Sequence, residues 1–480
     1  MSQILEAISQ RAKSRPLDPA LRGAGVEYGW QALSDAVSRT ADDFSARLTT
    51  TGPVALDLDN GPDWVIADLA LMRLGAPAVP LPPFFTRAQR KYVQQDVGAR
   101  AMVRPALDVS GAVSANGGLA LAEIESWPVR LPAGTAKITY TSGSTGRPKG
   151  VCLSLAQMEA LACALVDVLG ADYAGVHLPI LPLGVLLENV AGLYPTLLAG
   201  GIYHAAGLAE TGFANPFRPE FGRLAGAVAA TGATSLIVVP EILRGLIAAK
   251  TAMVLDFPAL KLVAVGGAKV SPQLLAGARV CGLPVVEGYG LSECASVVAL
   301  NRPGKSRDGT VGKPLPHLTV EIAADGEIVV GPQPFLGYVG EADHVGPVHT
   351  GDLGSLDPDG YLTITGRKSN TIINAFGRNI APEWVESELL AQPEIAQVLV
   401  FGEAQPILGA LVVPVSATVL PQQLEAAIAR ANAALPAYAH VGRWTPVPPF
   451  DPAKGELTGN GRPRRGVLLD TYSAFVNGAP

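Results

Sequence analysis

The sequence predicts an α/β protein, with a large N-terminal domain of mixed sheets flanked by helices and a small α+β C-terminal domain. Its 480 residues exceed the size at which a single hydrophobic core stops growing. The composition changes near Gly366, where a second, smaller unit begins. Short apolar runs alternate with amphipathic helical segments, which is typical of largely parallel sheets. Examples of these runs are residues 53–58, 138–140, 234–239 and 260–265.

Four further segments of the large domain carry a clear signal. Residues 63–74 are predicted to form a helix, because apolar residues recur there at helical spacing. Residues 151–153 are predicted to complete a hairpin strand. Ser154 then begins a helix as its N-cap, with Gln157 three positions later in the capping-box pattern. The most apolar stretch, residues 178–202, is interrupted by prolines and polar residues, so we predict a buried helix rather than a membrane span.

The second unit is predicted to be compact and to contain both helices and strands. The boundary is placed at residues 367–370, which divides the chain into residues 1–366 and residues 371–480. The elements expected after this boundary are a helix at 382–392, strands at 396–401 and 410–415, and a helix at 422–435.

The composition excludes several classes of protein. Hydrophobic residues make up 48% and charged residues 16% of the chain, as in a well-buried globular enzyme and unlike a disordered chain. The net charge of −6 gives no electrostatic basis for binding nucleic acid. The four cysteines show no Cys-x-x-Cys spacing, so we expect small buried thiols in a reducing cytoplasm. The apolar composition leaves peripheral membrane contact open.

Residues 140–150 carry the strongest functional signal. Glycine lets the backbone approach a ligand closely, successive N–H groups with Ser and Thr hydroxyls form an anion site, and Lys149 adds a point charge for a phosphate. Pro148 stands where a Walker A loop has its second glycine, so the pattern argues against a P-loop NTPase. The predicted phosphate site consists of Thr141, Ser142, Gly143, Ser144, Thr145, Gly146 and Lys149.

This run resembles the phosphate-binding signature of the adenylate-forming enzymes, the superfamily of acyl-CoA synthetases, nonribosomal-peptide adenylation domains and luciferases. Further segments resemble that family's motifs in the same order along nearly the whole chain. The resemblance implies that ATP activates a carboxylic acid to an acyl-adenylate, with release of pyrophosphate, before a thiol takes the acyl group. It also implies that the small domain is mobile about a hinge at 367–370, where Ser369 replaces the commoner Asp or Lys.

Residues 288–293 resemble the second strong motif of the family. The resemblance places Tyr289 near the adenine, Ser292 at a phosphate and Glu293 on Mg²⁺ as a hard oxygen ligand. Charge builds on the phosphate oxygens during adenylation, so such a site needs cations, N–H donors and a metal ion. The nucleotide-site residues implied by this motif are Gly288, Tyr289, Gly290, Ser292 and Glu293.

One further turn and two single residues resemble the family's adenine and ribose contacts. Gly266, Gly267 and Ala268 look like the adenine-side turn, where missing side chains let a flat base lie against the backbone. Asp352 and Arg367 match positions that bind ribose hydroxyls in the family. A carboxylate such as that of Asp352 can accept hydrogen bonds from both vicinal hydroxyls of a ribose.

One position departs from the family pattern. The family has a lysine near the C-terminus that bridges carboxylate and phosphate, whereas Arg462 occupies that position here. The charge is kept, but a planar fork replaces a point ammonium. Either Arg462 performs the role, which we favour, or Lys454 reaches in from the preceding turn, or adenylation is impaired and the chain only binds nucleotide. The catalytic residues implied by the resemblance are Lys149, Thr145, Glu293 and Arg462.

Residues 178–188 resemble the stretch that contributes to the acyl pocket of long-chain acyl-CoA synthetases, which often carry a His near position 185. Plain core packing is the alternative interpretation. An apolar, roomy lining favours a fatty or otherwise apolar small-molecule carboxylate. The residues expected to border it are Gly184, Val185, Glu188, Gly267 and Gly290.

The thiol acceptor is expected to be coenzyme A. The alternative is the phosphopantetheine of an acyl carrier protein, as in acyl- or aryl-AMP ligases. Residues 376–380 resemble the loop that enters the site in the thioester-forming state, where Gly377 would let a thiol arm pass close to the backbone. Arg378 could serve either acceptor, because both carry acidic groups.

Overall fold

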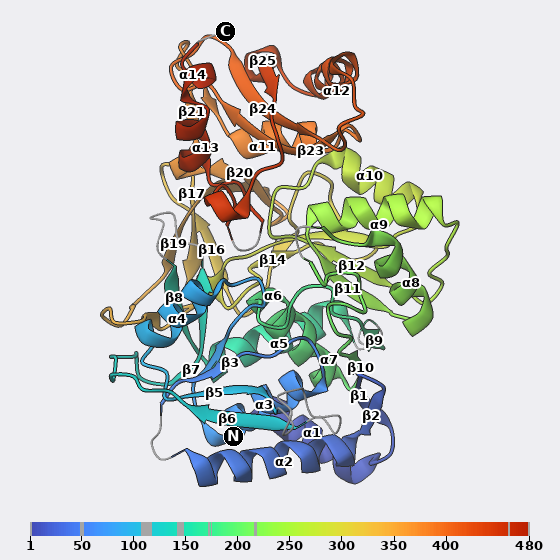
Figure 1. The fold of residues 1–480 in the computed structure, drawn as a ribbon, viewed down its shortest axis with the longest axis vertical. Helices are drawn as coiled ribbons and strands as arrows, with labels where there is room; N and C mark the ends of the chain where they lie inside the picture. The colour runs from blue at the N-terminus through green and yellow to red at the C-terminus, as the bar shows by residue number, and fades with distance from the viewer. Residues whose placement is uncertain are drawn as a thin grey trace.

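The structure is a computed structural model, and it describes residues 2–48, 52–106, 118–141, 148–170, 173, 175–215, 218–458 and 461–478. These residues form five sheets in a large N-terminal domain and a small C-terminal domain. Figure 1 shows the small domain, in orange and red, capping one end of the large one. The prediction of an α/β protein with mixed sheets and a smaller second domain is confirmed.

A seven-stranded sheet forms one half of the large domain, in the order β18-β8-β7-β4-β3-β5-β6. The pairs β4–β7, β3–β4 and β3–β5 are parallel, and the strands outside them join antiparallel. All three residues of β3 are buried, which is why the strand reads as a continuous apolar run. The strands are β3 (Val54–Leu56), β4 (Ala78–Pro80), β5 (Ala101–Pro105), β6 (Leu119–Glu123), β7 (Thr135–Thr141), β8 (Lys149–Ser154) and β18 (Gly337–Tyr338).

A nine-stranded sheet forms the other half, in the order β15-β14-β13-β12-β11-β9-β10-β1-β2. Strands β13 to β1 in this order are parallel, and β2, β14 and β15 pair antiparallel at the edges. The strands are β1 (Pro19–Gly23), β2 (Val26–Gly29), β9 (Val176–His177), β10 (Ile202–His204), β11 (Ser235–Val238), β12 (Leu262–Val265), β13 (Val285–Tyr289), β14 (Ala299–Leu300) and β15 (Lys313–Pro314).

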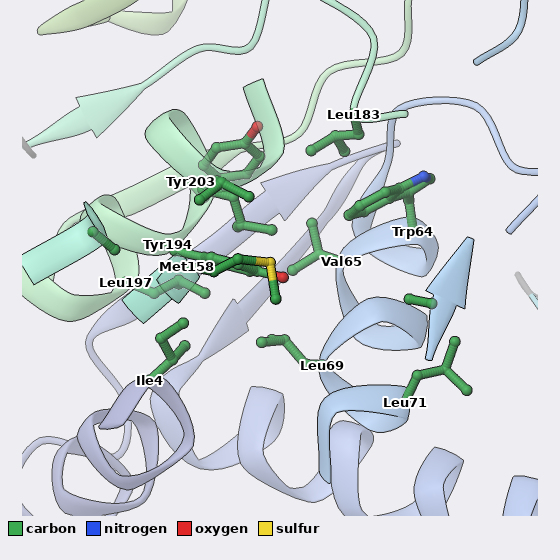
Figure 2. Close-up of a cluster of buried hydrophobic side chains, with 14 of the residues drawn as sticks. Ile4, Trp64, Val65, Leu69, Leu71, Met158, Leu183, Tyr194, Leu197 and Tyr203 are labelled. Atoms are coloured by element: carbon green, nitrogen blue, oxygen red, sulfur yellow. The ribbon is translucent and has the colours of Figure 1, made fainter. Parts of the chain in front are cut away.

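Helices cover these two sheets and fill the space between them (Figure 1). Val65 and Leu69 of α3 point toward Met158 of α5 and Tyr194 of α7 in the core (Figure 2). The helices are α1 (Gln3–Ser14), α2 (Trp30–Arg47), α3 (Pro62–Leu74), α4 (Arg87–Asp96), α5 (Leu155–Leu169), α6 (Leu186–Glu188), α7 (Tyr194–Ala199), α8 (Phe221–Thr231), α9 (Pro240–Ala252) and α10 (Pro272–Val280). The predicted helix at 63–74 is confirmed by α3, and the predicted capping box is present at the start of α5.

A buried ion pair joins three of these elements. The Lys137 ammonium on β7 lies 2.7 Å from Asp68 Oδ1 on α3 and donates to Tyr194 Oη at 2.7 Å. It also donates to Asn189 Oδ1, and the Tyr194 hydroxyl donates to Asp68 Oδ2 at 2.7 Å. These hydrogen bonds compensate the cost of burying both charges and fix how α3 and α7 sit against the sheet.

The prediction of one buried helix over residues 178–202 is wrong in its extent. Residues 178–185 are not helical, and the helical part runs from α6 through a π-helical turn (η2, Asn189–Leu193) to α7. The run ends at Gly200, which takes the left-handed conformation of a helix C-cap, and Pro195 lies inside the run, in the first turn of α7 where the π-helical turn ends. The stretch is largely buried, as predicted.

A four-stranded antiparallel sheet, β16-β17-β19-β20, leads from the large domain to the small one. Its last strand ends at Arg367, and the short helix η4 (Lys368–Asn370) follows at the predicted boundary. The strands are β16 (Thr319–Ile322), β17 (Glu327–Gly331), β19 (Val348–Leu356) and β20 (Leu362–Arg367).

The small domain has its own core around the three-stranded sheet β23-β24-β25. The four elements predicted there are present with ends within two residues, while β21, β22, β25, α13 and α14 were not predicted. Its elements are β21 (Ile372–Ile373), β22 (Asn379–Ile380), α11 (Pro382–Leu390), β23 (Ile395–Phe401), β24 (Leu408–Pro414), α12 (Pro421–Ala433), β25 (Val441–Pro446), α13 (Arg465–Thr471) and α14 (Ser473–Val476). The cysteines are all free thiols, and Cys152 and Cys294 are buried.

Candidate active site

A cleft beneath the small domain brings together the ends of several strands. It continues as a cavity into the large domain, and the whole space measures about 2490 Å³. Most of the residues predicted for the site line this space. They are Lys149, Gly184, Val185, Gly266, Gly267, Ala268, Gly288, Tyr289, Gly290, Ser292, Glu293, Asp352, Arg367 and Arg462.

A cation and a carboxylate flank Tyr338 at one side of the cleft. The Nζ of Lys149 lies 4.7 Å from the centre of the Tyr338 ring and 3.2 Å from Glu341 Oε1. The Tyr338 hydroxyl donates to Glu293 Oε1 at 3.0 Å. Burial and the neighbouring Glu293 carboxylate raise the pKa of Tyr338, so the phenol keeps its proton and remains a donor. The Glu293 carboxylate and the Lys149 ammonium therefore both lie at the Tyr338 side chain.

Most of the predicted phosphate loop, comprising Ser142, Gly143, Ser144, Thr145 and Gly146, lies outside the described residues. Its flanks are described. Thr141 ends β7 and pairs with Lys149, the first residue of β8. This hairpin brings both ends of the predicted loop to the cleft, where Lys149 meets Tyr338.

Two glycine turns form a flat wall after β12 and β13. A Cβ on Gly266 would lie 2.9 Å from the Gly288 carbonyl oxygen, and one on Gly290 would overlap the Ser296 carbonyl. Gly267 has a φ of +82°, which disfavours any residue with a side chain. Backbone packs directly against backbone here, and the resulting surface can accept a planar group.

Tyr289, Asp352 and Arg367 form a polar cluster beside this wall. The Tyr289 hydroxyl donates to Asp352 Oδ2 at 2.7 Å, and Arg367 Nη1 lies 3.5 Å from Asp352 Oδ1. Asp352 and Arg367 face each other in register across β19 and β20. Burial raises the pKa of Asp352, whereas the Arg367 charge opposes that rise. The two charged groups together can bind neighbouring hydroxyls.

Arg462 reaches across the cleft from the small domain. Its guanidinium donates to the Gly267 carbonyl oxygen, so it lies at the glycine wall. Lys454 is exposed and is not among the described residues that line the cleft. Of these two cations, only Arg462 is among the described residues that line the cleft.

The cavity continues past Gly184 and Val185 into the large domain. A Cβ on Gly184 would lie 2.9 Å from Pro82 Cα, so this glycine lets two loops pack closely at the cavity wall. Glu188 differs from its predicted position at the cavity surface. Its carboxylate is fully buried and accepts hydrogen bonds from His177 and Tyr203.

The residues predicted for the thiol acceptor lie away from the cleft. Gly377 has a φ of +70°, and the Arg378 guanidinium lies 5.9 Å from the centre of the Tyr438 ring. Neither is among the described lining residues, whereas Ser369 at the predicted hinge is. Their part in thioester formation remains a prediction.

Sequence reasoning missed three side chains that shape this site. Tyr338 is 45 positions from Glu293 along the chain, and no local motif marks it. Arg244 of α9 reads as an ordinary helix-surface cation, although it contacts the small domain. His177 could have been noticed as a lone imidazole before an apolar stretch, but its partners are distant in sequence.

The chain matches the AMP-binding enzyme family over residues 8–341. The chain belongs to this family. The AMP-binding enzyme C-terminal domain matches residues 369–479. The predicted membership of the adenylate-forming superfamily is thereby confirmed.

Curated relatives of this AMP-binding enzyme include ligases for different acids. It is 36% identical over 242 residues to the long-chain-fatty-acid–CoA ligase FadD15 of Mycobacterium bovis, a match that covers 44% of this chain and 40% of the relative's length. It is 30% identical to the 2-succinylbenzoate–CoA ligase of Bacillus velezensis, over 83% of this chain and 84% of that protein.

The fold matches solved structures of similar size. The o-succinylbenzoate coenzyme A synthetase MenE of Bacillus subtilis, in complex with AMP, superposes with a TM-score of 0.77 and 24% identity. The match covers 97% of this AMP-binding enzyme and 98% of that chain. Among the described residues, no helix has the length and apolarity needed to cross a membrane.

Proposed function

We propose that this AMP-binding enzyme activates an apolar carboxylic acid with ATP to an acyl-adenylate, releases pyrophosphate, and transfers the acyl group to the thiol of coenzyme A. One observation carries the proposal. A single cleft gathers a phosphate-side lysine, a carboxylate at a second glycine turn, a carboxylate–arginine pair and an arginine from the small domain. The relatives named as fatty-acid and succinylbenzoate CoA ligases support the same reaction type.

Different residues of the cleft would bind the adenine, the ribose, the phosphates and the metal ion. The wall at Gly266 and Gly267 would receive the adenine, and Asp352 would accept from the ribose hydroxyls with Arg367 beside it. Lys149 would bind phosphate oxygens. Glu293 suits Mg²⁺, because one carboxylate plus substrate phosphates is the usual ligand set for this ion. When bound, Mg²⁺ supplies positive charge next to the phosphate oxygens.

The small domain would serve the first half of the reaction in the observed arrangement. Arg462 lies at the Gly267 carbonyl, where a cation can hold the substrate carboxylate against the α-phosphate. The domain also covers the cleft, and the exclusion of water protects a mixed anhydride from hydrolysis. We place the hinge at residues 367–370, with Ser369 facing the cleft.

The test is a pyrophosphate-exchange screen over saturated fatty acids of graded length and a set of aromatic acids. We expect exchange with at least one apolar acid, and trapping with hydroxylamine should yield its hydroxamate. The products should be AMP and pyrophosphate. Formation of ADP would contradict the proposal.

The second half-reaction is tested by adding coenzyme A or a phosphopantetheinylated carrier protein to the same mixture. We expect the thioester to form with coenzyme A. Thioester on the carrier protein alone would overturn the choice of acceptor. Tight ATP binding without exchange for any acid would instead identify a nucleotide-binding protein that has lost adenylation.

A further inference from the structure

A group of four polar side chains is buried in the large domain beside the acyl cavity. His177 Nε2 and Glu188 Oε1 lie 2.8 Å apart, and His177 Nδ1 and Ser235 Oγ lie 2.9 Å apart. The Tyr203 hydroxyl donates to Glu188 Oε1 at 3.1 Å, and its ring stacks on the imidazole with 5.5 Å between centres. All four side chains are less than a tenth exposed. We call these residues the His177 cluster.

The cluster forms part of the cavity wall. His177 and Ser235 line the cavity, and so does Gly192, which lies against the His177–Glu188 hydrogen bond. A Cβ on Gly192 would lie 2.9 Å from His177 Nε2 and would also overlap Glu188 Oε1. The rest of this part of the wall is mainly apolar, contributed by α5, α7 and β11. It includes Leu165, Leu169, Pro195, Ala199, Leu236 and Ile237.

After the hydrogen bonds within the cluster are formed, Ser235 Oγ can still form one more, and Glu188 Oε2 has none in the described part of the chain. With a neutral imidazole, Nε2–H donates to Glu188 and Nδ1 accepts from the Ser235 hydroxyl, whose oxygen can then accept from another donor. With a protonated imidazole, Nδ1–H donates to Ser235 instead, and the hydroxyl hydrogen is free to donate. Glu188 Oε2 is buried and has no partner within the described residues. Buried polar groups are normally paired, and because Glu188 is not among the described residues that line the cavity, a water molecule is the expected partner of this oxygen.

The position of Ser235 sets a distance from the reacting carboxylate. Ser235 is the first residue of β11, and Gly266 N–H donates to the carbonyl of Val238 at the other end of that strand. Three residues of strand span roughly 10 Å. With carbon–carbon bonds of about 1.5 Å in a zigzag, a chain of roughly eight to ten carbons connects the glycine wall to Ser235.

We propose that the His177 cluster is a polar subsite of the acyl cavity, which binds a hydroxyl group carried by the substrate's alkyl chain through Ser235 Oγ. A hydroxyl both donates and accepts, so it satisfies Ser235 in either state of His177. The favoured substrate is then a hydroxylated medium-chain acid rather than a plain fatty acid. The inference rests on the proposed acid activation and deepens it by naming the substrate class.

The experiment compares ω-hydroxydecanoate with decanoate by pyrophosphate exchange. We expect the wild-type kcat/KM to favour the hydroxy acid by about 10-fold, because the plain acid offers no partner for the remaining hydrogen-bonding capacity of Ser235 Oγ. Ser235→Ala should lower this ratio to near unity. Ser235→Cys, which keeps the volume and offers a weaker donor, should give an intermediate ratio and covers the case in which the alanine variant fails to fold.

The matched control is Ser387→Ala. Ser387 is a buried serine of the small domain that donates to the Trp384 carbonyl, so this variant should keep the wild-type ratio. An unchanged ratio in Ser235→Ala, or a wild-type enzyme that prefers decanoate, would overturn the subsite while leaving acid activation intact. If no acid supports exchange, calorimetric titration with the two acids decides: tighter binding of ω-hydroxydecanoate supports the subsite, and equal or weaker binding overturns it.

Discussion

Arg462 shows how one side chain can take a place expected for a different residue type. Its guanidinium crosses the cleft and donates to the Gly267 carbonyl, while a planar fork still leaves other N–H groups for a substrate carboxylate. A lysine at this position would offer a point charge on a flexible stem. In the proposed role of Arg462, the charge of the bridging cation is kept and the geometry of its hydrogen bonds changes.

Replacing Arg462 tests its role in adenylation directly. We expect Arg462→Ala to lower the rate of pyrophosphate exchange by about 100-fold, because a charge-assisted contact present in the transition state is lost. Lys454→Ala is the matched control and should stay within a few-fold of wild type, since Lys454 is exposed away from the cleft. The reverse pattern, with Arg462→Ala active and Lys454→Ala inactive, would show that Lys454 is the bridging cation.

Glu287 on β13 makes the stability of the protein depend on pH. Burial raises the pKa of Glu287 to about 7, although the nearby Lys269 charge opposes the rise. The folded protein therefore holds this proton at pH values where the unfolded chain, with an ordinary pKa of about 4.3, has released it. This contribution to the unfolding free energy is fully present below about pH 4 and is lost as the pH rises through the folded-state pKa of about 7, by up to about 4 kcal/mol.

Glu287→Gln should flatten this dependence. We expect wild-type Tm to fall relative to the variant between pH 5 and pH 8, measured by calorimetry at fixed ionic strength. The glutamine has nearly the same shape and cannot ionise, so only the titrating contribution is removed. Parallel Tm profiles for the two proteins would contradict the assignment.

At the level of elements, sequence motifs correctly predicted features that depend on residues close together in the chain. The capping box at the start of α5 pairs Ser154 Oγ with the Gln157 N–H and the Gln157 side chain with the Ser154 N–H, and both hydrogen bonds depend on residues three positions apart. The glycines at 266 and 290 were predicted from their resemblance to family motifs, and the structure shows that the packing at both positions leaves no room for a side chain.

Contacts between distant segments could not be predicted in this way. Tyr338 reaches Glu293 because β18 pairs with β8 at the edge of the seven-stranded sheet, a pairing with no sequence motif. The His177 cluster likewise depends on β9 lying beside β11. The helical part of residues 178–202 begins only at Leu186 and ends at the left-handed Gly200, limits that overall apolarity does not mark.

Removing the cap tests how much α5 depends on it. We expect Ser154→Ala to lower the unfolding free energy of the large domain by about 1 kcal/mol, because the first turn loses a hydrogen-bond acceptor. Urea denaturation followed by circular dichroism measures this. Ser38→Ala, within α2, removes only a bond to a carbonyl one turn back and should cost clearly less. Equal losses would show that the cap contributes nothing of its own.

At the scale of the whole molecule, Arg244 of α9 fixes the small domain over the cleft. Its Nη1 donates to the carbonyls of Leu390 at 2.7 Å and Ile395 at 2.9 Å, and its Nη2 donates to Ala396 at 3.4 Å. One side chain of the large domain thus holds three backbone groups of the small one. The arrangement that places Arg462 in the cleft depends on such contacts.

Arg244→Ala should lower the rate of adenylation more than the rate of thioester formation. We expect pyrophosphate exchange to fall about 10-fold, the equivalent of a hydrogen-bonding loss of 1 to 2 kcal/mol, because the closed arrangement becomes less populated. Thioester formation from supplied acyl-adenylate should fall less. Arg223→Ala, an exposed arginine of α8, is the control and should change neither step. An equal fall in both steps would show that Arg244 does not select between domain arrangements.

The partners of Arg244 are main-chain oxygens, so the contact depends on the backbone position of these residues and not on their side chains. Positions 390, 395 and 396 can therefore change residue type without losing the interaction, within the limits of core packing. Position 244 has no such freedom. A saturation-mutagenesis profile should show this asymmetry across the interface, with an intolerant position 244 facing the tolerant, partly buried positions 390 and 396, while position 395 is limited by its burial in the core.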